Sequence, residues 1–421
     1  MSKKSIVLIG ILSLLLTAFF GAAAAADSPT VLRLWHLQAG PLGTALEELV
    51  EDFNSQHPGI EVRPEFMGDA TALHQKIMAA IAANDPPELA QVAETYAANY
   101  IAEDVLLPIE NFFDGPNGLS AEDRADLVPT ALKIATYDLE GRDTVVVWPF
   151  NISLEVMFYN PEMLAEAGLA VPSTWDEFND VVRSLHLDNE RWGYAWTPDV
   201  VLFINLLRSH GGRLFNDDLS EAAFNDEIGL EVMNYLVELV DNGTMITNGF
   251  DWQFELINER AALATNTIVS KAYIEADLGD RFELGVAPIP AGSKRSAVVW
   301  GSAFGIFQVD DEKSRAAWEF LKWIGKTEQV ARWSAVSGYL PTRYSAFEDP
   351  LIKEQMEVNA ALRVGLETLE FAQPEPNFVA WPQIRSAISN AVNAVALGLM
   401  TPEQALRDAA QKTNRILLMA N

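Results

Sequence analysis

The segment 31–35, with the sequence Val-Leu-Arg-Leu-Trp, opens the part of the chain that decides the fold, and it predicts a strand. The segment 60–64 predicts a second strand, and 71–83 predicts a helix that ends before the turn residues 84–87. Between the strands, apolar residues recur at the spacing of an amphipathic helix, at Leu42, Ala45, Leu46, Leu49, Val50 and Phe53. The order strand, helix, strand, helix predicts a parallel sheet with crossover helices.

Further elements follow the same α/β pattern. The segment 88–92 predicts another strand, and the apolar segment 144–150 is expected to lead from one lobe to another. The sequence Thr-Trp-Asp-Glu at 174–177 is a capping box that predicts the start of a long helix. The segments 282–290 and 297–308 predict a strand and an apolar, glycine-containing stretch, which we expect to return to the first lobe.

The beginning of the chain has the layout of a secretory signal. Lys3 and Lys4 precede an apolar run over 6–20, and the alanine-rich residues 22–26 lead into Asp27. We therefore expect residues 1–26 to be cleaved and the mature protein to reside in a periplasm. The chain has no cysteine that could carry a lipid anchor. The alternative is an uncleaved N-terminal anchor.

Composition narrows the class of protein. The chain has 421 residues, more than one hydrophobic core usually organises, which favours two lobes. Its 59 acidic and 29 basic residues give a net charge of −30, and such a charge repels nucleic acids and anionic membranes. Without cysteine there are no disulfides, so stability must come from core burial.

Catalytic and metal motifs are absent from the sequence. The five histidines lack paired ligand spacing, so we predict no metal site and no cofactor. The sequence has no phosphate-binding Walker loop, and the serine in 301–305 stands one place too early for a nucleophile elbow. Among 59 acidic residues a catalytic carboxylate pair remains an alternative, which would make the protein a glycoside hydrolase. An adhesion or chaperone-like protein would need an exposed apolar face.

Several motifs occur in a fixed order along the mature chain, namely Leu-Trp-His at 34–36, Phe-Asn-Ser-Gln-His-Pro-Gly-Ile-Glu-Val at 53–62, Phe-Tyr-Asn at 158–160, Thr-Trp-Asp-Glu-Phe at 174–178 and Ser-Gly-Tyr-Leu-Pro at 337–341. In these motifs the chain resembles extracellular solute-binding proteins of carbohydrate-type ABC importers. It is most similar to the glycerol-3-phosphate-binding branch, through Trp-His at 35–36, Gln-Val-Ala-Glu at 91–94, Pro-Phe-Asn at 149–151, the same motif at 337–341 and Pro-Gln-Ile-Arg at 382–385.

The resemblance implies an α/β, two-lobed periplasmic binding protein fold of type II, with mixed sheets flanked by helices and several inter-lobe crossovers. The N-terminal lobe would comprise 27–148 and 283–335, and the C-terminal lobe 149–282 and 336–421. A small-molecule carbohydrate or polyol would bind in the cleft of a monomer. The lobes would close on it about a hinge and present it to membrane permease subunits, and neither ATP nor nucleic acid would bind.

The resemblance also implies ligand-binding positions, at His36, Glu94, Asn151, Ser153, Ser270, Gly301, Ser302 and Tyr339. The chain departs from the branch at Asp69 and Asn377, where phosphate-binding members place a tyrosine and an arginine. The loss of a guanidinium favours a neutral sugar or glycosylated polyol, with glycerol 3-phosphate or a glycerophosphodiester as the alternative. Sugar rings stack on indoles, and the tryptophans near strand ends or loops are Trp35, Trp196, Trp300 and Trp381.

Overall fold

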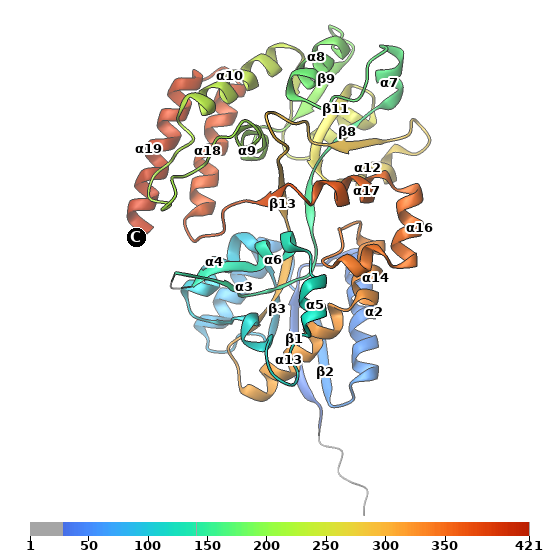
Figure 1. Cartoon of the computed structure of the whole chain (residues 1–421), viewed down its shortest axis with the longest axis vertical. Helices are drawn as coiled ribbons and strands as arrows, with labels where there is room; N and C mark the ends of the chain where they lie inside the picture. Colours follow the sequence, from blue (N-terminus) through green and yellow to red (C-terminus); the bar gives the residue numbers. More distant parts are fainter. Residues whose placement is uncertain (1–27, 140, 421) are drawn as a thin grey trace, which may run out of the picture.

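The computed structural model describes residues 28–139 and 141–420. The predicted signal over 1–26 lies outside these residues. Figure 1 shows two lobes, one above the other, joined near the centre of the molecule. Within the described ranges, no helix combines the length and the apolar character needed to cross a bilayer.

The lower lobe in Figure 1 is built on a sheet that begins with the parallel strands β1 (Thr30–His36), β2 (Ile60–Phe66) and β3 (Leu89–Ala93). The strand order is β2-β1-β3-β14-β4, and it includes the late strand β14 (Ser302–Phe307), which runs antiparallel to β3. The short strands β4 (Leu106–Leu107) and β7 (Trp148–Pro149) pair with β14. The predicted parallel start of the sheet is confirmed.

Helices cover this sheet on both faces. The predicted amphipathic helix is α2, in which Phe53 packs edge-on against Phe320, at a centroid distance of 5.1 Å. Apolar faces of this kind supply most of the stability of such helices. The remaining elements of the lobe are α3 (Ala70–Ala82), α4 (Glu94–Ala102), η1 (Ile109–Phe112), α5 (Ala121–Asp126), α6 (Pro129–Ala135), the hairpin β5 (Thr136–Leu139) and β6 (Arg142–Val145), α13 (Asp311–Ile324) and α14 (Thr327–Ser337), with α2 over Gly40–Gln56.

The upper lobe is built on a larger mixed sheet, whose strand order is β10-β9-β11-β8-β13-β15, with β12 pairing β8. Strand β8 runs antiparallel to its neighbours β11, β12 and β13, whereas β9 runs parallel to β10 and β11. The strands are β8 (Ser153–Tyr159), β9 (Trp192–Trp196), β10 (Thr244–Ile246), β11 (Ala261–Thr267), β12 (Gly285–Pro288), β13 (Ala297–Trp300) and β15 (Ala372–Pro374).

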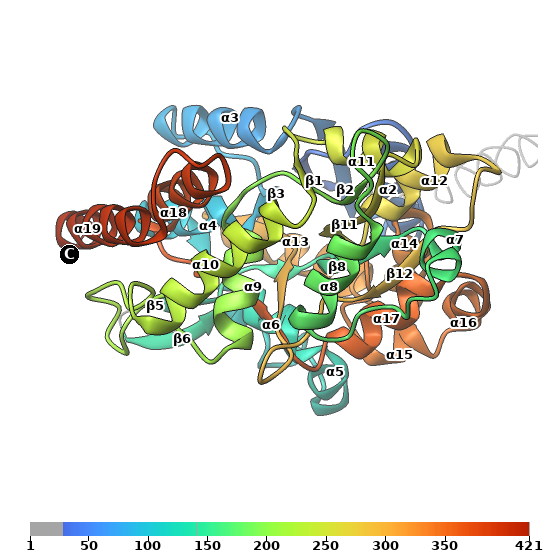
Figure 2. The same ribbon diagram turned by 90° about the horizontal axis from the view of Figure 1, so that it is seen from above.

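The long antiparallel helices α18 and α19 form one side of the upper lobe, as both views show (Figures 1 and 2). The predicted capping box is present, because Glu177 N donates to the Thr174 hydroxyl and the Glu177 carboxylate accepts from Thr174 N. The helices of this lobe and of the connection to it are α7 (Pro161–Glu166), α8 (Trp175–Leu185), α9 (Val200–Ser209), α10 (Glu227–Asp241), α11 (Asp251–Ile257), α12 (Ser270–Leu278), α15 (Tyr344–Phe347), α16 (Pro350–Val358), α17 (Ala360–Thr368), α18 (Trp381–Ala396) and α19 (Pro402–Ala420).

The chain crosses upward at 149–153, between β7 and β8, and returns at Gly301, between β13 and β14. We expected the return near 283, and this boundary needs correction, because β12 and β13 pair with β8 in the larger sheet. Residues 283–300 therefore belong to the upper lobe. After α14 the chain passes the same seam again, where Leu340 N donates to the Ile152 carbonyl at 2.9 Å.

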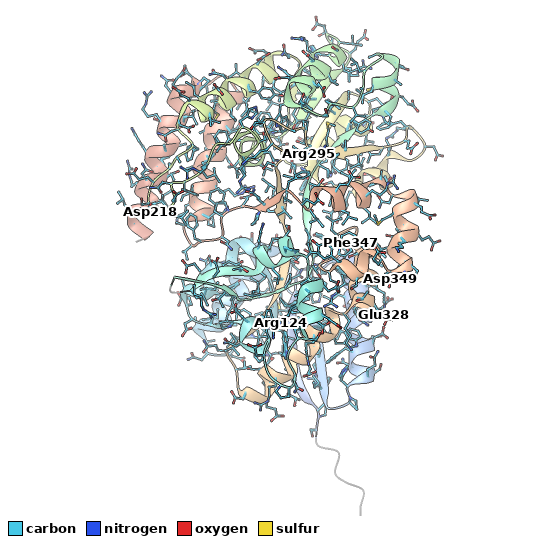
Figure 3. All side chains as sticks on the ribbon, viewed as in Figure 1. Arg124, Asp218, Arg295, Glu328, Phe347 and Asp349 are labelled. Carbon is cyan, nitrogen blue, oxygen red and sulfur yellow. The ribbon has the colours of Figure 1, made fainter. Side chains whose placement is uncertain are left out.

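A buried apolar cluster joins the lobes beside these crossings. It includes Ile134 of α6, Ile152, Leu340 and Phe347. Figure 3 shows Phe347 at the level of the junction between the lobes. Burial of these apolar side chains favours contact between the lobes beside the crossings.

An ion network supports the lower sheet. Glu88, which is 2% exposed, accepts from Arg33 Nε at 3.1 Å and from Lys313 Nζ at 2.7 Å. Burial opposes ionisation, but the hydrogen bonds from Arg33 and Lys313 outweigh it and lower the pKa of Glu88. The network ties β1 to α13 across more than 200 residues of sequence.

We expect Glu88→Gln to lower the free energy of unfolding at pH 7 by about 3 kcal/mol, because it leaves two cations without their buried partner. A lowered carboxyl pKa contributes stability above the unfolded pKa, and this contribution is lost as the pH falls below it. The variant should therefore lose less stability than the wild type below about pH 4. Urea unfolding followed by circular dichroism measures both effects. Glu61→Gln, which breaks the exposed pair with Arg63, is the control and should change little. Equal effects of the two substitutions would contradict the network's role.

Candidate functional site

A cavity of about 230 Å³, which we call the hinge cavity, lies where the chain crosses between the lobes. The lower lobe contributes the ends of β1, β3 and β14, and the upper lobe contributes β8, β13 and the connection from β11 to α12. The lining residues are Leu37, Gln38, Gln91, Asn151, Ser153, Thr267, Val269, Trp300, Gly301, Ser302 and Tyr339. Any solute in this cavity touches both lobes.

The two crossing segments at 149–153 and 300–302 run against each other. Phe150 N and Asn151 N both donate to the Ser302 carbonyl, at 2.9 and 3.2 Å, and Ser302 N donates to Asn151 Oδ1 at 2.8 Å. A Cβ added to Gly301 would lie 2.4 Å from the Asn151 carbonyl oxygen. The backbones therefore approach too closely for any side chain at position 301.

The polar groups of the hinge cavity differ in how far they are satisfied. Gln91 is held on both sides, since its Nε2 donates to Ser302 Oγ at 2.7 Å and its Oε1 accepts from Leu37 N at 3.3 Å. In contrast, Ser153 Oγ and Asn151 Nδ2 are buried and have no hydrogen-bond partner among the described residues. Buried polar groups are normally paired, so these two atoms provide sites for solute or water oxygens.

A second cavity of about 320 Å³, the inner cavity, extends into the upper lobe and shares Thr267 and Trp300 with the hinge cavity. Strand β9 ends with Trp196 in its wall, and Asp199 stands at the N-cap of α9. The lining residues are Glu155, Trp196, Thr197, Asp199, Val201, Leu202, Gly249, Phe250, Trp252, Thr265, Asn266, Thr267, Trp300 and Arg385. Together the cavities offer indole surfaces and many hydrogen-bonding groups.

Glu375 positions the wall between the two cavities. Its Oε1 accepts from Trp300 Nε1, and its Oε2 accepts from Trp381 Nε1 and Arg385 Nε, each at 2.9 Å. Arg385 Nη2 also lies 3.8 Å from Asp199. One buried carboxylate thus fixes an indole and a guanidinium that both line the inner cavity.

The carboxyl groups of the inner cavity are harder to ionise than usual. Burial, followed by the charge of Asp199, raises the pKa of Glu155 well above its ordinary value, which favours a neutral acid that can donate a hydrogen bond. Desolvation by the surrounding protein raises the pKa of Asp199 to about 6, although Arg385 favours its anion and its side chain is 38% exposed. Within the described part of the chain, no group of three or more His, Asp and Glu side chains is arranged to hold a metal ion.

The structure brings half of the predicted site residues to these cavities. Those in the hinge cavity are Asn151, Ser153, Trp300, Gly301, Ser302 and Tyr339, and Trp196 lines the inner cavity. Burial raises the pKa of Tyr339, so its phenol keeps its proton. No site role was predicted for Glu155, Asp199, Glu375 or Arg385. Arg385 closes the quoted motif at 382–385, which was a usable signal, whereas the acids follow no local pattern.

Three predicted residues are buried and are not part of the lining of either cavity. Trp381 is 1% exposed in the core of the upper lobe, and its indole nitrogen is bound to Glu375. His36 is 1% exposed, beneath the end of β1. Ser270 begins α12, and its hydroxyl donates to Asn266 Oδ1 at 3.0 Å.

Three further predicted residues form hydrogen bonds within the protein, outside both cavities. Trp35 Nε1 donates to Glu65 at 3.1 Å, and Asp69 caps α3 by accepting from Ala72 N at 2.8 Å. Asn377 Nδ2 donates to the Thr136 carbonyl at 2.5 Å, which links the upper lobe to the end of α6. Neither cavity includes these side chains. Glu94 is the first residue of α4, and its side chain lies outside what the structure describes.

Comparison with known proteins identifies the family. Residues 48–360 match the family described as bacterial extracellular solute-binding protein. The chain belongs to this family. Among curated proteins, this solute-binding protein is 25% identical to the sn-glycerol-3-phosphate-binding periplasmic protein UgpB of Pectobacterium atrosepticum, over 95% of its own chain and 94% of the relative.

Solved structures share the fold of this solute-binding protein. The sugar-binding protein MalE of Xanthomonas citri has a TM-score of 0.82 at 21% identity, over 93% of this chain and 98% of that one. The cyclic alpha-maltosyl-1,6-maltose binding protein of Arthrobacter globiformis gives 0.81 at 23% identity, over 92% and 99%. UgpB of Mycobacterium tuberculosis, in complex with glycerophosphocholine, gives 0.78 at 21% identity, over 94% and 99%. These likenesses confirm the two-lobed α/β fold.

We expect Asp199→Asn to change how stability depends on pH. With a pKa of about 6 against 3.8 for an ordinary aspartate, the folded protein holds an extra proton between these values, so Asp199 costs stability as the pH rises through this window. The free energy of unfolding of the variant should therefore rise relative to that of the wild type from pH 4 to pH 7, as measured by urea unfolding. Asparagine also caps helices, which preserves the start of α9. Asp226→Asn, at the N-cap of α10, controls for the loss of a capping carboxylate. A pH-independent difference at position 199 would contradict the assignment.

Proposed function

We propose that the protein is the exported solute-binding component of an ABC importer, which captures a neutral carbohydrate or glycosylated polyol in the hinge and inner cavities and delivers it to permease subunits. The observation that carries this proposal is that Trp300 and Thr267 line both cavities, with Trp196 in the wall of the inner cavity. Indole faces stack on the C–H faces of sugar rings, and the surrounding polar groups replace water at the hydroxyls.

The state of Arg385 favours a neutral solute. Its Nε is bound to Glu375 and its Nη2 faces Asp199, so two carboxylates already share its charge. A phosphate in the inner cavity would compete with them for the guanidinium and would face the carboxylate of Asp199. The second candidate ligand is glycerol 3-phosphate or a glycerophosphodiester, because one UgpB relative is named for binding glycerol 3-phosphate and another was solved with glycerophosphocholine.

Capture would work by a shift of population between open and closed lobes. The hinge cavity is lined from both lobes, so a solute gains its full set of contacts in the closed form and favours that form by the difference in affinity. We place this monomeric carrier in the periplasm, where the closed form would dock on a permease. An importer component must release its cargo, which suits a dissociation constant near 1 μM, or about −8 kcal/mol.

A thermal-shift screen tests the function directly. The purified protein is heated with monosaccharides, disaccharides, glycosylated polyols, glycerol 3-phosphate and glycerophosphodiesters. A solute at 100 times its dissociation constant adds about 2.7 kcal/mol, which is readily seen. A neutral carbohydrate that stabilises without turnover supports the proposal. A phosphorylated solute would support the second candidate, and hydrolysis of a glycoside would support an enzyme that uses Glu155 and Asp199.

We expect Trp196→Phe to weaken binding of the best carbohydrate from this screen about tenfold, or about 1.4 kcal/mol, because part of the stacking surface is lost. Isothermal titration calorimetry measures the change. Trp192→Phe is a matched control in the same strand, since Trp192 lies at the outer end of β9 and is 38% exposed. Equal affinities of Trp196→Phe and wild type would remove the inner cavity from the binding site.

A further inference from the structure

The amide of Asn151 can be oriented without ambiguity. A backbone N–H can only donate, so the side-chain atom that faces Ser302 N at 2.8 Å is the oxygen Oδ1. The other atom, Nδ2, is therefore a donor. It belongs to a residue that lines the hinge cavity and is 2% exposed, and the described chain offers it no acceptor.

Asn205 provides an internal comparison. Its Oδ1 accepts from Val298 N at 2.8 Å, and its Nδ2 is likewise buried without an acceptor from the described residues. However, Asn205 lies on α9 in the core of the upper lobe and lines neither cavity. The two amides share one local arrangement, and what distinguishes Asn151 is its place at a crossing beside a solute-sized space.

We propose that Asn151 couples solute capture to the movement of the lobes, with its amide nitrogen binding an acceptor oxygen of the solute while its amide oxygen holds the returning segment at Ser302. The solute part of this inference rests on the proposed function. It requires that the captured molecule place an oxygen with a free lone pair at the hinge end of the cavity, near Ser153 Oγ.

The surrounding contacts explain why this position controls the lobes. Asn151 N and Phe150 N bind the Ser302 carbonyl while Asn151 Oδ1 binds Ser302 N, so both backbone groups of Ser302 are tied to one crossing segment. The next residue, Ile152, accepts from Leu340 N, where the chain passes the seam again. A rotation of the lobes must change backbone angles here, and a solute that fixes the Asn151 amide restricts that change.

Two substitutions separate the two halves of the amide. Asn151→Asp keeps an oxygen that accepts from Ser302 N, and, measured at a pH where the new carboxyl is ionised, it replaces the donor that faces the cavity by a negatively charged acceptor. Asn151→Ala removes both interactions. Asn205→Ala deletes the matched amide in the upper lobe and serves as the control for a buried asparagine that is remote from the hinge.

The distance between the lobes is the readout. The chain has no cysteine, so Gln75→Cys on α3 and Asp408→Cys on α19 take spin labels at chosen exposed positions. Without any solute, we expect Asn151→Ala to broaden the distance distribution and to speed amide hydrogen exchange at Ser302. Asn151→Asp and Asn205→Ala should match the wild type in both measurements. If Asn151→Ala also matches the wild type, the hinge role is overturned.

The second arm uses maltose and sn-glycerol 3-phosphate as probes. We expect the probe that shortens the distance in the wild type to bind Asn151→Asp at least tenfold more weakly and to bind Asn205→Ala unchanged. Equal closure of Asn151→Asp and wild type would overturn the coupling. Should neither probe act on the wild type, the carbohydrate assignment fails for those compounds, while the solute-free arm still decides the role of Asn151 in the hinge. Circular dichroism confirms that each variant is folded.

Discussion

The structure depends on one close approach, between the backbone at Gly301 and the carbonyl of Asn151. Because residue 301 has no side chain, the two crossing segments can lie close enough for their backbones to form hydrogen bonds between the two sheets. The lobes are therefore joined by a narrow backbone seam, flanked by the apolar cluster around Ile152 and Phe347. Both cavities open beside this seam, so the same contacts that join the lobes also shape the walls that a solute would meet.

The chemistry of the cleft differs from that of the whole chain. The net charge of −30 describes a strongly acidic protein, and at the inner cavity Arg385 faces two carboxylates, Glu375 at 2.9 Å and Asp199 at 3.8 Å, so it offsets only part of their charge. Burial raises the pKa of Glu155, which removes a further negative charge from the cavity. A cavity whose carboxyl groups are partly neutralised and whose walls include indoles suits the polyhydroxy solutes proposed above, whereas the acidic surface favours solubility.

Local patterns in the sequence predicted what depends on neighbours in the chain. The strands and helices from Val31 to Ala83 and the capping box at Thr174 were confirmed, because periodicity and capping act within a few residues. The crossing residues Asn151, Ser153 and Gly301 were instead predicted from the family resemblance, and they line the hinge cavity. The sheet that receives β12 was misassigned, since an apolar strand does not encode its partner. Trp381 and Glu375 show the same limit, because a core indole and its buried carboxylate meet only after α18 packs.

The position of β14 has a consequence for the order of folding. This strand, over 302–307, lies between β3 and β4, which stand some 200 residues earlier in the chain. Until residues 302–307 are made, β4 and β7 therefore lack the strand that they pair with, and β3 has a free edge. Contacts of such long sequence separation form slowly. The interleaved topology thus keeps the growing chain incompletely folded for most of its synthesis, a state that suits passage through a narrow membrane channel before the lobes assemble.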